Sequence, residues 1–183
     1  MADKLKSIAV YCGHQFGSDA QFKRDAAAVG RMLAKNGIRM VFGGGDVGLM
    51  GTVATAALKN GGEVIGVSTV DVIAMQEPAH EEVELQVVEG VNERKQIMFN
   101  ESEAFIILPG GIGTLNELSD ILTMQQIGET NKPLFFLNTN GFWNPLTRLI
   151  KHMKKNGFIV KTDNYNIFYA ETVAELKKLI LKY

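Results

Sequence analysis

The sequence is poor in cysteine, in excess charge and in long apolar runs. Its single cysteine, Cys12, excludes an internal disulfide framework. The formal net charge is −1 and no long basic run is present, which argues against nucleic acid as the main partner. No apolar stretch is long enough to span a bilayer, and the residues after Met1 lack the apolar core of a signal peptide. We therefore expect a cytoplasmic protein with no membrane partner.

Motifs for metal binding and for nucleophilic catalysis are also missing. The three histidines, His14, His80 and His152, are scattered without metal-ligand spacing. No Cys/His or Ser/His/Asp arrangement is readable. The sequence has two glycine-rich turns, but neither has the spacing of a dinucleotide fingerprint and neither is followed by a Walker A lysine. If the protein binds a small ligand, it therefore does so without these motifs.

Short apolar runs alternate with amphipathic segments along the whole chain. Strands are expected near residues 7–12, 38–42, 63–68, 84–88, 104–108, 133–138 and 167–169, with helices between most of them and a surface loop at 69–82. The length, 183 residues, suits one full core and is too short for two ordinary domains. The pattern predicts an α/β fold: one Rossmann-like domain over residues 1–183, with a doubly wound parallel sheet and helices on both faces.

The most informative stretch is Pro109-Gly110-Gly111-Ile112-Gly113-Thr114, which joins a buried strand to a helix. Its glycines have no Cβ, so the backbone can come close to a ligand. The free N–H groups at the start of the helix favour an anion. Thr114 adds a hydroxyl group, and Glu117 adds a carboxylate one turn further on. We therefore predict a phosphate cradle with an acid beside it.

A second glycine turn, Gly43-Gly44-Gly45, follows another strand. One such turn can simply connect a strand to a helix, so alone it is a weak signal. The carboxyl ends of parallel strands share one edge of a sheet. Two glycine turns at that edge therefore predict a shared ligand cleft.

Other interpretations compete with a functional one at the charged residues. Thr114-x-x-Glu117 also fits a capping box, in which the glutamate only satisfies a backbone N–H, and the pattern alone favours that interpretation. Arg94 shares a helical face with Ile97 and Met98, so it either extends past the apolar stripe to water, which is commoner, or reaches into a cleft. Lys95 is expected to be solvated. The residue patterns thus predict a phosphate-bearing ligand and leave the chemistry open.

Taken together, these segments resemble the LOG family of cytokinin-activating phosphoribohydrolases, long labelled "lysine decarboxylases". The Arg94-Lys95 pair combined with the Pro-Gly-Gly-x-Gly-Thr-x-x-Glu motif is the specific part of the resemblance. A decarboxylase would need a pyridoxal lysine site, for which there is no motif. The remaining matches extend over nearly the whole chain: Val10-Tyr11-Cys12-Gly13, Gly43-Gly44-Gly45, Gly48-Leu49-Met50-Gly51, Leu122-Thr123-x-Gln125 and Lys132-Pro133.

The resemblance implies hydrolysis of the N-glycosidic bond of a purine riboside 5′-monophosphate, with an N6 side chain on the adenine of favoured substrates. It implies no metal or organic cofactor, and a homodimer or larger homo-oligomer. By the same similarity Arg94 and Glu117 are the catalytic pair. The residues expected to bind substrate are Gly44, Gly45, Glu77, Lys95, Gly110, Gly111, Ile112, Gly113, Thr114 and Thr123.

Two alternatives stay open beside this expectation. One is a protein that binds a nucleotide or a molybdenum-cofactor-like pterin without turnover, and the other is a general AMP nucleosidase. The chain departs from the usual family residues around the pocket, which puts the identity of the base in question more than the reaction. These departures are His14, Gln15, Asn92, Ile112, Asn116 and Met124.

Overall fold

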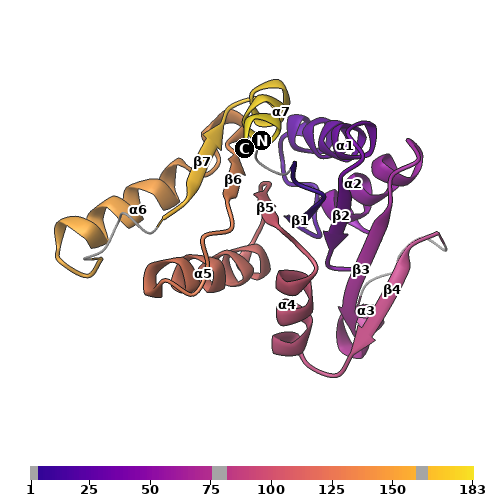
Figure 1. Ribbon diagram of the computed structural model, residues 1–183, viewed down its shortest axis with the longest axis horizontal. Helices are drawn as coiled ribbons and strands as arrows, with labels where there is room; N and C mark the ends of the chain where they lie inside the picture. Colours follow the sequence, from indigo (N-terminus) through magenta and orange to yellow (C-terminus); the bar gives the residue numbers. More distant parts are fainter. Residues whose placement is uncertain (1–3, 76–81, 160–164) are drawn as a thin grey trace.

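Figure 1 shows the computed structural model, which describes residues 4–75, 82–159 and 165–183. Within this part of the chain, parallel strands form a seven-stranded sheet in the order β4-β3-β2-β1-β5-β6-β7. The predicted doubly wound parallel sheet is confirmed. The strands are β1 (Ser7–Tyr11), β2 (Arg39–Phe42), β3 (Val64–Thr69), β4 (Glu84–Val88), β5 (Ala104–Ile107), β6 (Leu134–Leu137) and β7 (Ile167–Ala170).

The helices follow the strands in alternation. They are α1 (Ala20–Lys35), α2 (Gly48–Leu58), α3 (Val70–Met75), α4 (Val91–Asn100), α5 (Ile112–Ile127), α6 (Asn144–Lys155) and α7 (Val173–Lys182), with a short 3₁₀ turn, η1, at Thr139–Gly141. The prediction of a loop over residues 69–82 is wrong where α3 forms. The Thr69 hydroxyl accepts a hydrogen bond from the Val72 amide at 3.2 Å, which starts this short helix.

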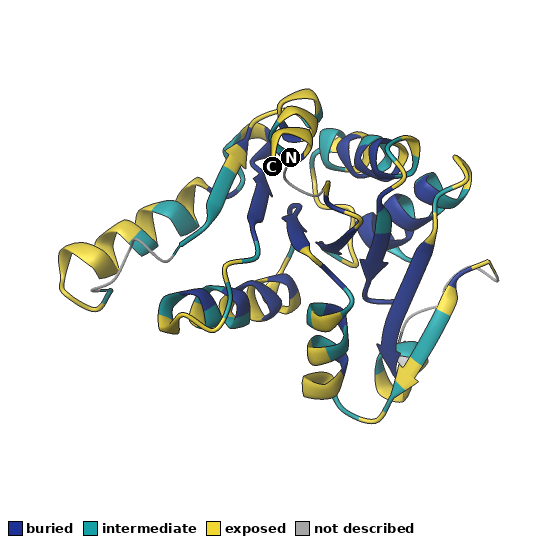
Figure 2. Cartoon of the chain, viewed as in Figure 1, coloured by how far each residue is buried: buried dark blue, intermediate teal, exposed yellow. Residues whose placement is uncertain are grey.

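Alternate strand residues enter two separate hydrophobic cores, one on each face of the sheet. In β1, Ile8 and Val10 belong to the core that contacts α1, α2 and α7, whereas Ala9 and Tyr11 belong to the core that contacts α4 and α5. The central strands are buried along their length (Figure 2). Strands buried on both faces explain the continuous apolar runs in the sequence.

The order of the strands reverses between β1 and β5, where the loops that follow them meet. The Gly13 amide donates a hydrogen bond to the Pro109 carbonyl at 3.0 Å, and the Gly13 carbonyl accepts from the Leu49 and Met50 amides at the start of α2. In open α/β sheets, such a reversal leaves a crevice at the carboxyl ends of the strands where ligands bind. None of the helices in residues 4–75, 82–159 and 165–183 is long and apolar enough to cross a bilayer.

Candidate active site

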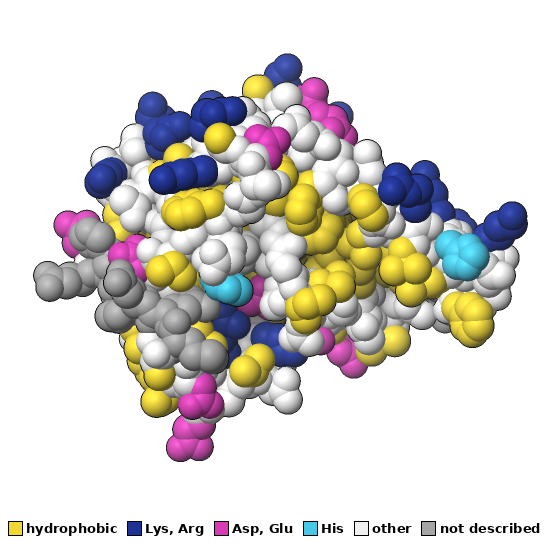
Figure 3. All heavy atoms as spheres, turned by 180° about the vertical axis from the view of Figure 1, so that it is seen from behind, with side chains coloured by type: hydrophobic (Ala, Val, Ile, Leu, Met, Phe, Trp, Pro, Cys, Tyr) yellow, Lys and Arg dark blue, Asp and Glu magenta, His cyan; other side chains and the backbone are white. Residues whose placement is uncertain are grey.

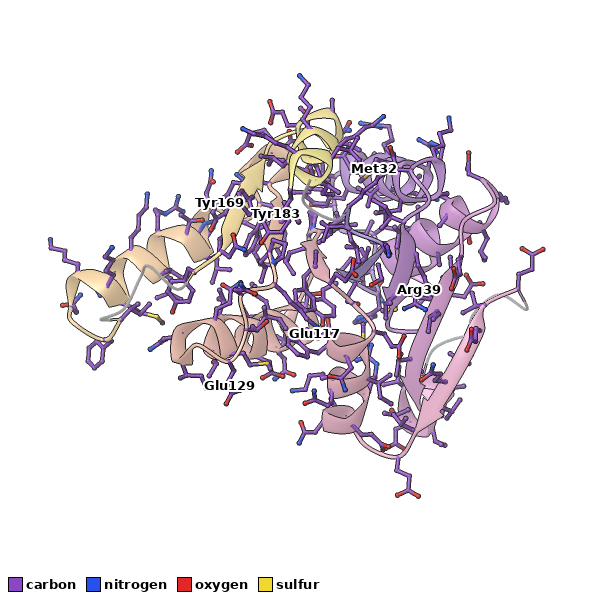
Figure 4. The ribbon with its side chains drawn as sticks, viewed as in Figure 1. Met32, Arg39, Glu117, Glu129, Tyr169 and Tyr183 are labelled. Atoms are coloured by element: carbon purple, nitrogen blue, oxygen red, sulfur yellow. The ribbon has the colours of Figure 1, made fainter. Side chains whose placement is uncertain are left out.

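Arg94 of α4 and Glu117 of α5 form a buried ion pair. The Arg94 Nη1 donates to the Glu117 Oε1 at 3.2 Å, and the Arg94 Nε donates to the Val67 carbonyl of β3 at 2.8 Å. The two residues are only 8% and 9% exposed. Figure 4 labels Glu117 where α5 comes close to α4. The favoured interpretation that Arg94 extends into solvent is therefore wrong, because its guanidinium is held inside by β3 and α5.

The glycine turn after β2 makes room for this arginine. A Cβ at Gly43 would overlap the Arg94 Nη2, so no larger residue fits without moving the guanidinium. Gly44 has φ +78°, a left-handed conformation, and a Cβ there would press on Ser68 and Leu85. Gly44 and Gly45 are buried in the same turn. Their predicted contact with substrate stays a prediction, while Gly43 positions Arg94.

The capping-box interpretation of Glu117 is wrong. The N-cap of α5 is Gly111, so Thr114 lies inside the first turn and not at the cap. Thr114 is buried against Gly110, where an added Cβ would overlap the Thr114 hydroxyl. The Glu117 carboxylate accepts its hydrogen bond from Arg94. The glutamate is thus available to a ligand beside the arginine.

Burial makes Glu117 a carboxyl group that titrates near neutral pH. Desolvation raises its pKa to about 7, against the lowering effects of Arg94 and Lys95, and the charge of Asp120 adds to the rise. A carboxyl group of this pKa in a cavity suits acid–base or charge-stabilising chemistry. Lys95 is not simply solvated, since its Nζ lies 2.6 Å from Asp120 and donates to Asn116 at 3.0 Å.

A cavity of about 360 Å³ opens between α4 and α5 beside Glu117. Lys95 and Thr123, both predicted to bind substrate, line it, and so do Asn92 and Met124. Two other lining residues, Tyr11 and Asp120, were missed by sequence reasoning. Asp120 lies three residues after Glu117 on the same helical face, a spacing that would have found it. Tyr11 looked like an ordinary core residue because it ends an apolar strand.

The start of α5 is open to solvent, as a phosphate cradle requires. Ile112 is 82% exposed, and Gly111 and Gly113 are also exposed. A second cavity, of about 160 Å³, lies here on the α1 side of the sheet, lined by the glycine turn and by His14 and Gln15. The smaller cavity thus lies at the turn before α5, whereas the larger one runs along α5 from Glu117 to Ile127. Glu77, also predicted to bind substrate, lies outside the described residues.

Two neighbouring glycines allow a test of the cradle with a built-in control. A Cβ at Gly110 would overlap Thr114, whereas a Cβ at Gly111 meets no atom within 4 Å. We expect Gly110→Ala to lower the melting temperature, because the start of α5 must shift. Gly111→Ala should keep the melting temperature and weaken binding of the predicted phosphate-bearing ligand, because its methyl group enters the space where that ligand would approach the amides. Thermal unfolding measures the melting temperatures, and calorimetric titration with AMP measures the affinities. Unchanged AMP affinity in Gly111→Ala would contradict the cradle.

Two ion pairs lie at the cavity: Glu117, which lines it, pairs with Arg94, and Lys95 pairs with Asp120, both of which line it. Within residues 4–75, 82–159 and 165–183, no three His, Cys, Asp or Glu side chains gather in a way that could hold a metal ion. What these residues offer a ligand is a charged pair, an open helix N-terminus and a cavity beside them.

Comparison with known proteins shows which family has a similar sequence. A family model described as "Possible lysine decarboxylase" matches residues 50–180. The chain is 39% identical over 169 residues to the cytokinin riboside 5′-monophosphate phosphoribohydrolase of Rhodococcoides fascians, covering 92% of this chain and 85% of that protein. It is 38% identical over 173 residues to the cytokinin riboside 5′-monophosphate phosphoribohydrolase LOG of Oryza sativa subsp. japonica, covering 94% and 72%.

Solved structures share the fold at lower identity. The molybdenum cofactor carrier protein of Chlamydomonas reinhardtii matches with a TM-score of 0.72 at 20% identity, over 97% of this chain and 99% of that one. The molybdenum cofactor binding protein of Rippkaea orientalis matches with a TM-score of 0.69 at 22% identity, over 98% and 97%. At such identities the match establishes the architecture alone.

Proposed function

Because this chain belongs to the LOG family, which includes cytokinin riboside 5′-monophosphate phosphoribohydrolases, we propose that it hydrolyses the N-glycosidic bond of a purine nucleoside 5′-monophosphate. The products are the free base and ribose 5-phosphate, and the favoured substrate is AMP with an N6 side chain. The observation that carries this proposal is the buried Arg94–Glu117 pair beside a cavity and one turn from an open helix N-terminus.

Each part of the site has a role in such a reaction. Breaking the glycosidic bond develops positive charge on the ribose, which the Glu117 carboxylate stabilises while it orients the attacking water. Arg94 donates a hydrogen bond that fixes the carboxylate, and its planar guanidinium can hold substrate oxygens. The amides at the start of α5 bind the 5′-phosphate. Adenosine, which lacks that phosphate, should therefore be a poor substrate.

Product analysis tests the proposal. The protein is incubated with AMP, with N6-isopentenyl-AMP and with adenosine, and free base and ribose 5-phosphate are quantified. We expect base from the monophosphates and little from adenosine. The AMP rate relative to the N6-modified rate separates a cytokinin-type enzyme from a general AMP nucleosidase. Release of no base from any purine monophosphate at high enzyme concentration would contradict the proposal.

The alternative is a carrier that binds a nucleotide or a molybdenum-cofactor-like pterin without turnover. Two observations support this alternative: the fold is shared with the carrier proteins, and residues around the cavities, among them His14 and Met124, differ from those usual in the family. A ligand that binds only the folded state raises the melting temperature. Thermal stabilisation by AMP that stays intact over hours would favour the carrier over the enzyme.

The rate of hydrolysis is expected to rise with pH through neutrality. Burial raises the pKa of Glu117 to about 7, and the ionised form is the one that stabilises a positive ribose. Below that pH the protonated form prevails and the rate falls, by about tenfold per pH unit at the acid end. A profile of kcat for AMP from pH 5 to 9 measures this. A flat profile across pH 6 to 8 would show that Glu117 is not the titrating group.

We also propose that two copies of the chain associate through α5 and α6. No residue of α6 is buried, although Leu149 and Met153 on it are apolar (Figure 2). An apolar groove of about 420 Å³ separates α6 from α5, and the view from behind shows a patch of hydrophobic side chains (Figure 3). Phe158, 80% exposed, stands at this groove. A projecting ring and a groove on one face suit a two-fold, self-complementary interface.

The composition of α5 agrees with a second copy as the occupant. Apart from Glu117 and Asp120, which pair with Arg94 and Lys95, α5 carries no charged residue. Depletion of charge marks the centre of protein interfaces. Thr123 lines both the groove and the catalytic cavity, so a copy bound there would border the active site.

Light scattering tests this association. We expect the wild-type protein to have twice the 20.1 kDa mass of the chain, and Leu149→Asp to be monomeric because its charge would be buried in the interface. The matched control is Leu181→Asp on α7, where a leucine of similar exposure (42% against 47%) lies on another helix. A wild-type monomer, or a dimer that survives Leu149→Asp, would contradict the proposed interface.

A further inference from the structure

We propose that Tyr11 binds substrate, with its phenolic hydroxyl donating a hydrogen bond to a sugar hydroxyl of the nucleotide beside Glu117. This proposal rests on the proposed function and adds a residue to that site. Tyr11 is the last residue of β1, the strand next to β5 at the reversal of strand order. It and Glu117 line the same cavity.

The packing of Tyr11 leaves its hydroxyl end for the cavity. Its ring stacks on Phe105 with centroids 5.7 Å apart at 17°, and Phe105 stacks in turn on Phe99 at 5.8 Å. The residue is only 2% exposed, and its ring belongs to the core beneath α4 and α5. Because a face of the ring is covered by Phe105, the ring is not placed to stack on a base. The edge that carries the hydroxyl is the part suited to meet a ligand.

The surroundings of Tyr11 keep its phenol protonated, so its hydroxyl can donate a hydrogen bond. Burial raises its pKa well above the ordinary value of 10, and the negative charges of Glu117 and Asp120 add to the effect, against the lowering effect of Arg94. The phenol is therefore protonated over the whole working range. Glu117 and Asp120 accept hydrogen bonds when ionised, while Arg94 and Lys95 carry positive charge and pair with them. Tyr11 thus contributes a neutral donor next to the charged Lys95, Glu117 and Asp120 of the cavity wall.

A sugar hydroxyl is the partner that this position favours. In the proposed reaction the anomeric carbon lies beside Glu117, and the ribose hydroxyls are the nearest polar groups of the substrate that carry no charge. A neutral phenol hydrogen-bonds such groups without the desolvation cost of a charged donor. The 5′-phosphate is assigned to the amides at the start of α5, one turn away from Glu117.

Tyr11→Phe tests the proposal because it removes the hydroxyl and keeps the ring stack. We expect kcat/KM for AMP to fall about 3- to 10-fold, the usual range for one neutral hydrogen bond, with the pH midpoint of the profile unchanged. The fall should disappear with either 2′-deoxy-AMP or 3′-deoxy-AMP, whichever lacks the bonded hydroxyl. The matched control is Tyr169→Phe in β7, another tyrosine stacked on a phenylalanine, which should behave as wild type (Figure 4).

Three results would overturn the assignment. The first is wild-type kinetics in Tyr11→Phe, and the second is an equal loss with AMP and both deoxynucleotides. The third is a shifted pH midpoint, because Tyr11 would then act through Glu117 and not on the sugar.

Binding separates this proposal from the proposed function. Calorimetry with AMP compares the Glu117→Gln variant with a double variant that also carries Tyr11→Phe, so that affinity is measured without turnover. We expect the double variant to lose affinity by about the same 3- to 10-fold factor. If the wild-type protein releases no base but Tyr11→Phe still weakens AMP binding, the enzymatic function fails and the role of Tyr11 stands. If wild type and Tyr11→Phe release base at equal rates, the enzymatic function stands and the role of Tyr11 fails.

Discussion

Replacing Glu117 by glutamine is expected to lower kcat for nucleotide hydrolysis by roughly 10²- to 10³-fold or more, because the developing positive charge loses its carboxylate. The fold should survive. Glutamine has nearly the same shape, and its carbonyl oxygen can accept the Arg94 hydrogen bond that Glu117 accepts at 3.2 Å. Burial already favours the neutral form of this side chain, since it raises the Glu117 pKa to about 7.

Single-turnover assays with AMP measure this effect, and thermal unfolding checks the fold. Glu84→Gln is the matched control, because it removes an exposed carboxylate at the amino end of β4, away from the carboxyl edge of the sheet. We expect its rate to equal that of the wild type. A Glu117→Gln rate within about twofold of wild type would remove Glu117 from the mechanism.

Replacing Arg94 by methionine should damage both activity and stability. Methionine fills part of the same space but leaves the Val67 carbonyl without its donor and Glu117 without its charge partner. Removing one member of a buried ion pair typically costs about 3–5 kcal/mol. Activity should fall by orders of magnitude, because the carboxylate is no longer held in place and its ionised form is disfavoured.

The loss of stability in Arg94→Met should depend on pH. Arg94 lowers the pKa of Glu117, so its removal raises that pKa further above the unfolded value. A carboxyl group whose folded pKa is raised destabilises the native state increasingly as pH rises through that pKa. Urea unfolding should therefore show a larger deficit at pH 9 than at pH 6.

A second substitution separates charge from packing in this prediction. Adding Glu117→Gln to Arg94→Met removes the unpaired carboxylate, so the double variant should regain much of the stability at pH 9 and none of the activity. An Arg94→Met protein with the same loss of stability at both pH values would show that Arg94 does not control the ionisation of Glu117.

The fold could be predicted from the sequence because its signals are local. Apolar runs such as Ser7–Tyr11 and Ala104–Ile107, separated by amphipathic helices, specify parallel strands buried on both faces. The exception is α3, a helix of six residues that lacks a periodic pattern and begins with a Thr69 hydroxyl cap. Such a short element depends on its position after β3 more than on propensity.

The site was only partly predictable because its key contacts join distant segments. Arg94 and Glu117 lie on helices separated by β5, and nothing within α4 tells whether its arginine points inward. The sequence patterns favoured a solvated Arg94 and a capping Glu117. The first interpretation is wrong because the order of the strands places α4 and α5 side by side on one face, and the second is wrong because the N-cap of α5 is Gly111 and not Thr114. The role of Gly43 as space for the guanidinium is likewise visible only in three dimensions.

The resemblance to the LOG family identified this pair where local patterns did not. It named Arg94 and Glu117 together, and the structure joins them in an ion pair whose glutamate lines the larger cavity. The departures from the family fall around that site: Asn92 and Met124 line the larger cavity, and His14 and Gln15 line the smaller one. The choice of base is therefore where this chain is expected to differ from its relatives.

A crystal structure of the Glu117→Gln variant with AMP tests the central claim most directly, because the variant should bind the substrate without cleaving it. We expect the 5′-phosphate on the amides at the start of α5, with the anomeric carbon beside residue 117 and the base in the cavity between α4 and α5. A phosphate bound elsewhere, or a glycosidic bond turned away from residue 117, would contradict it.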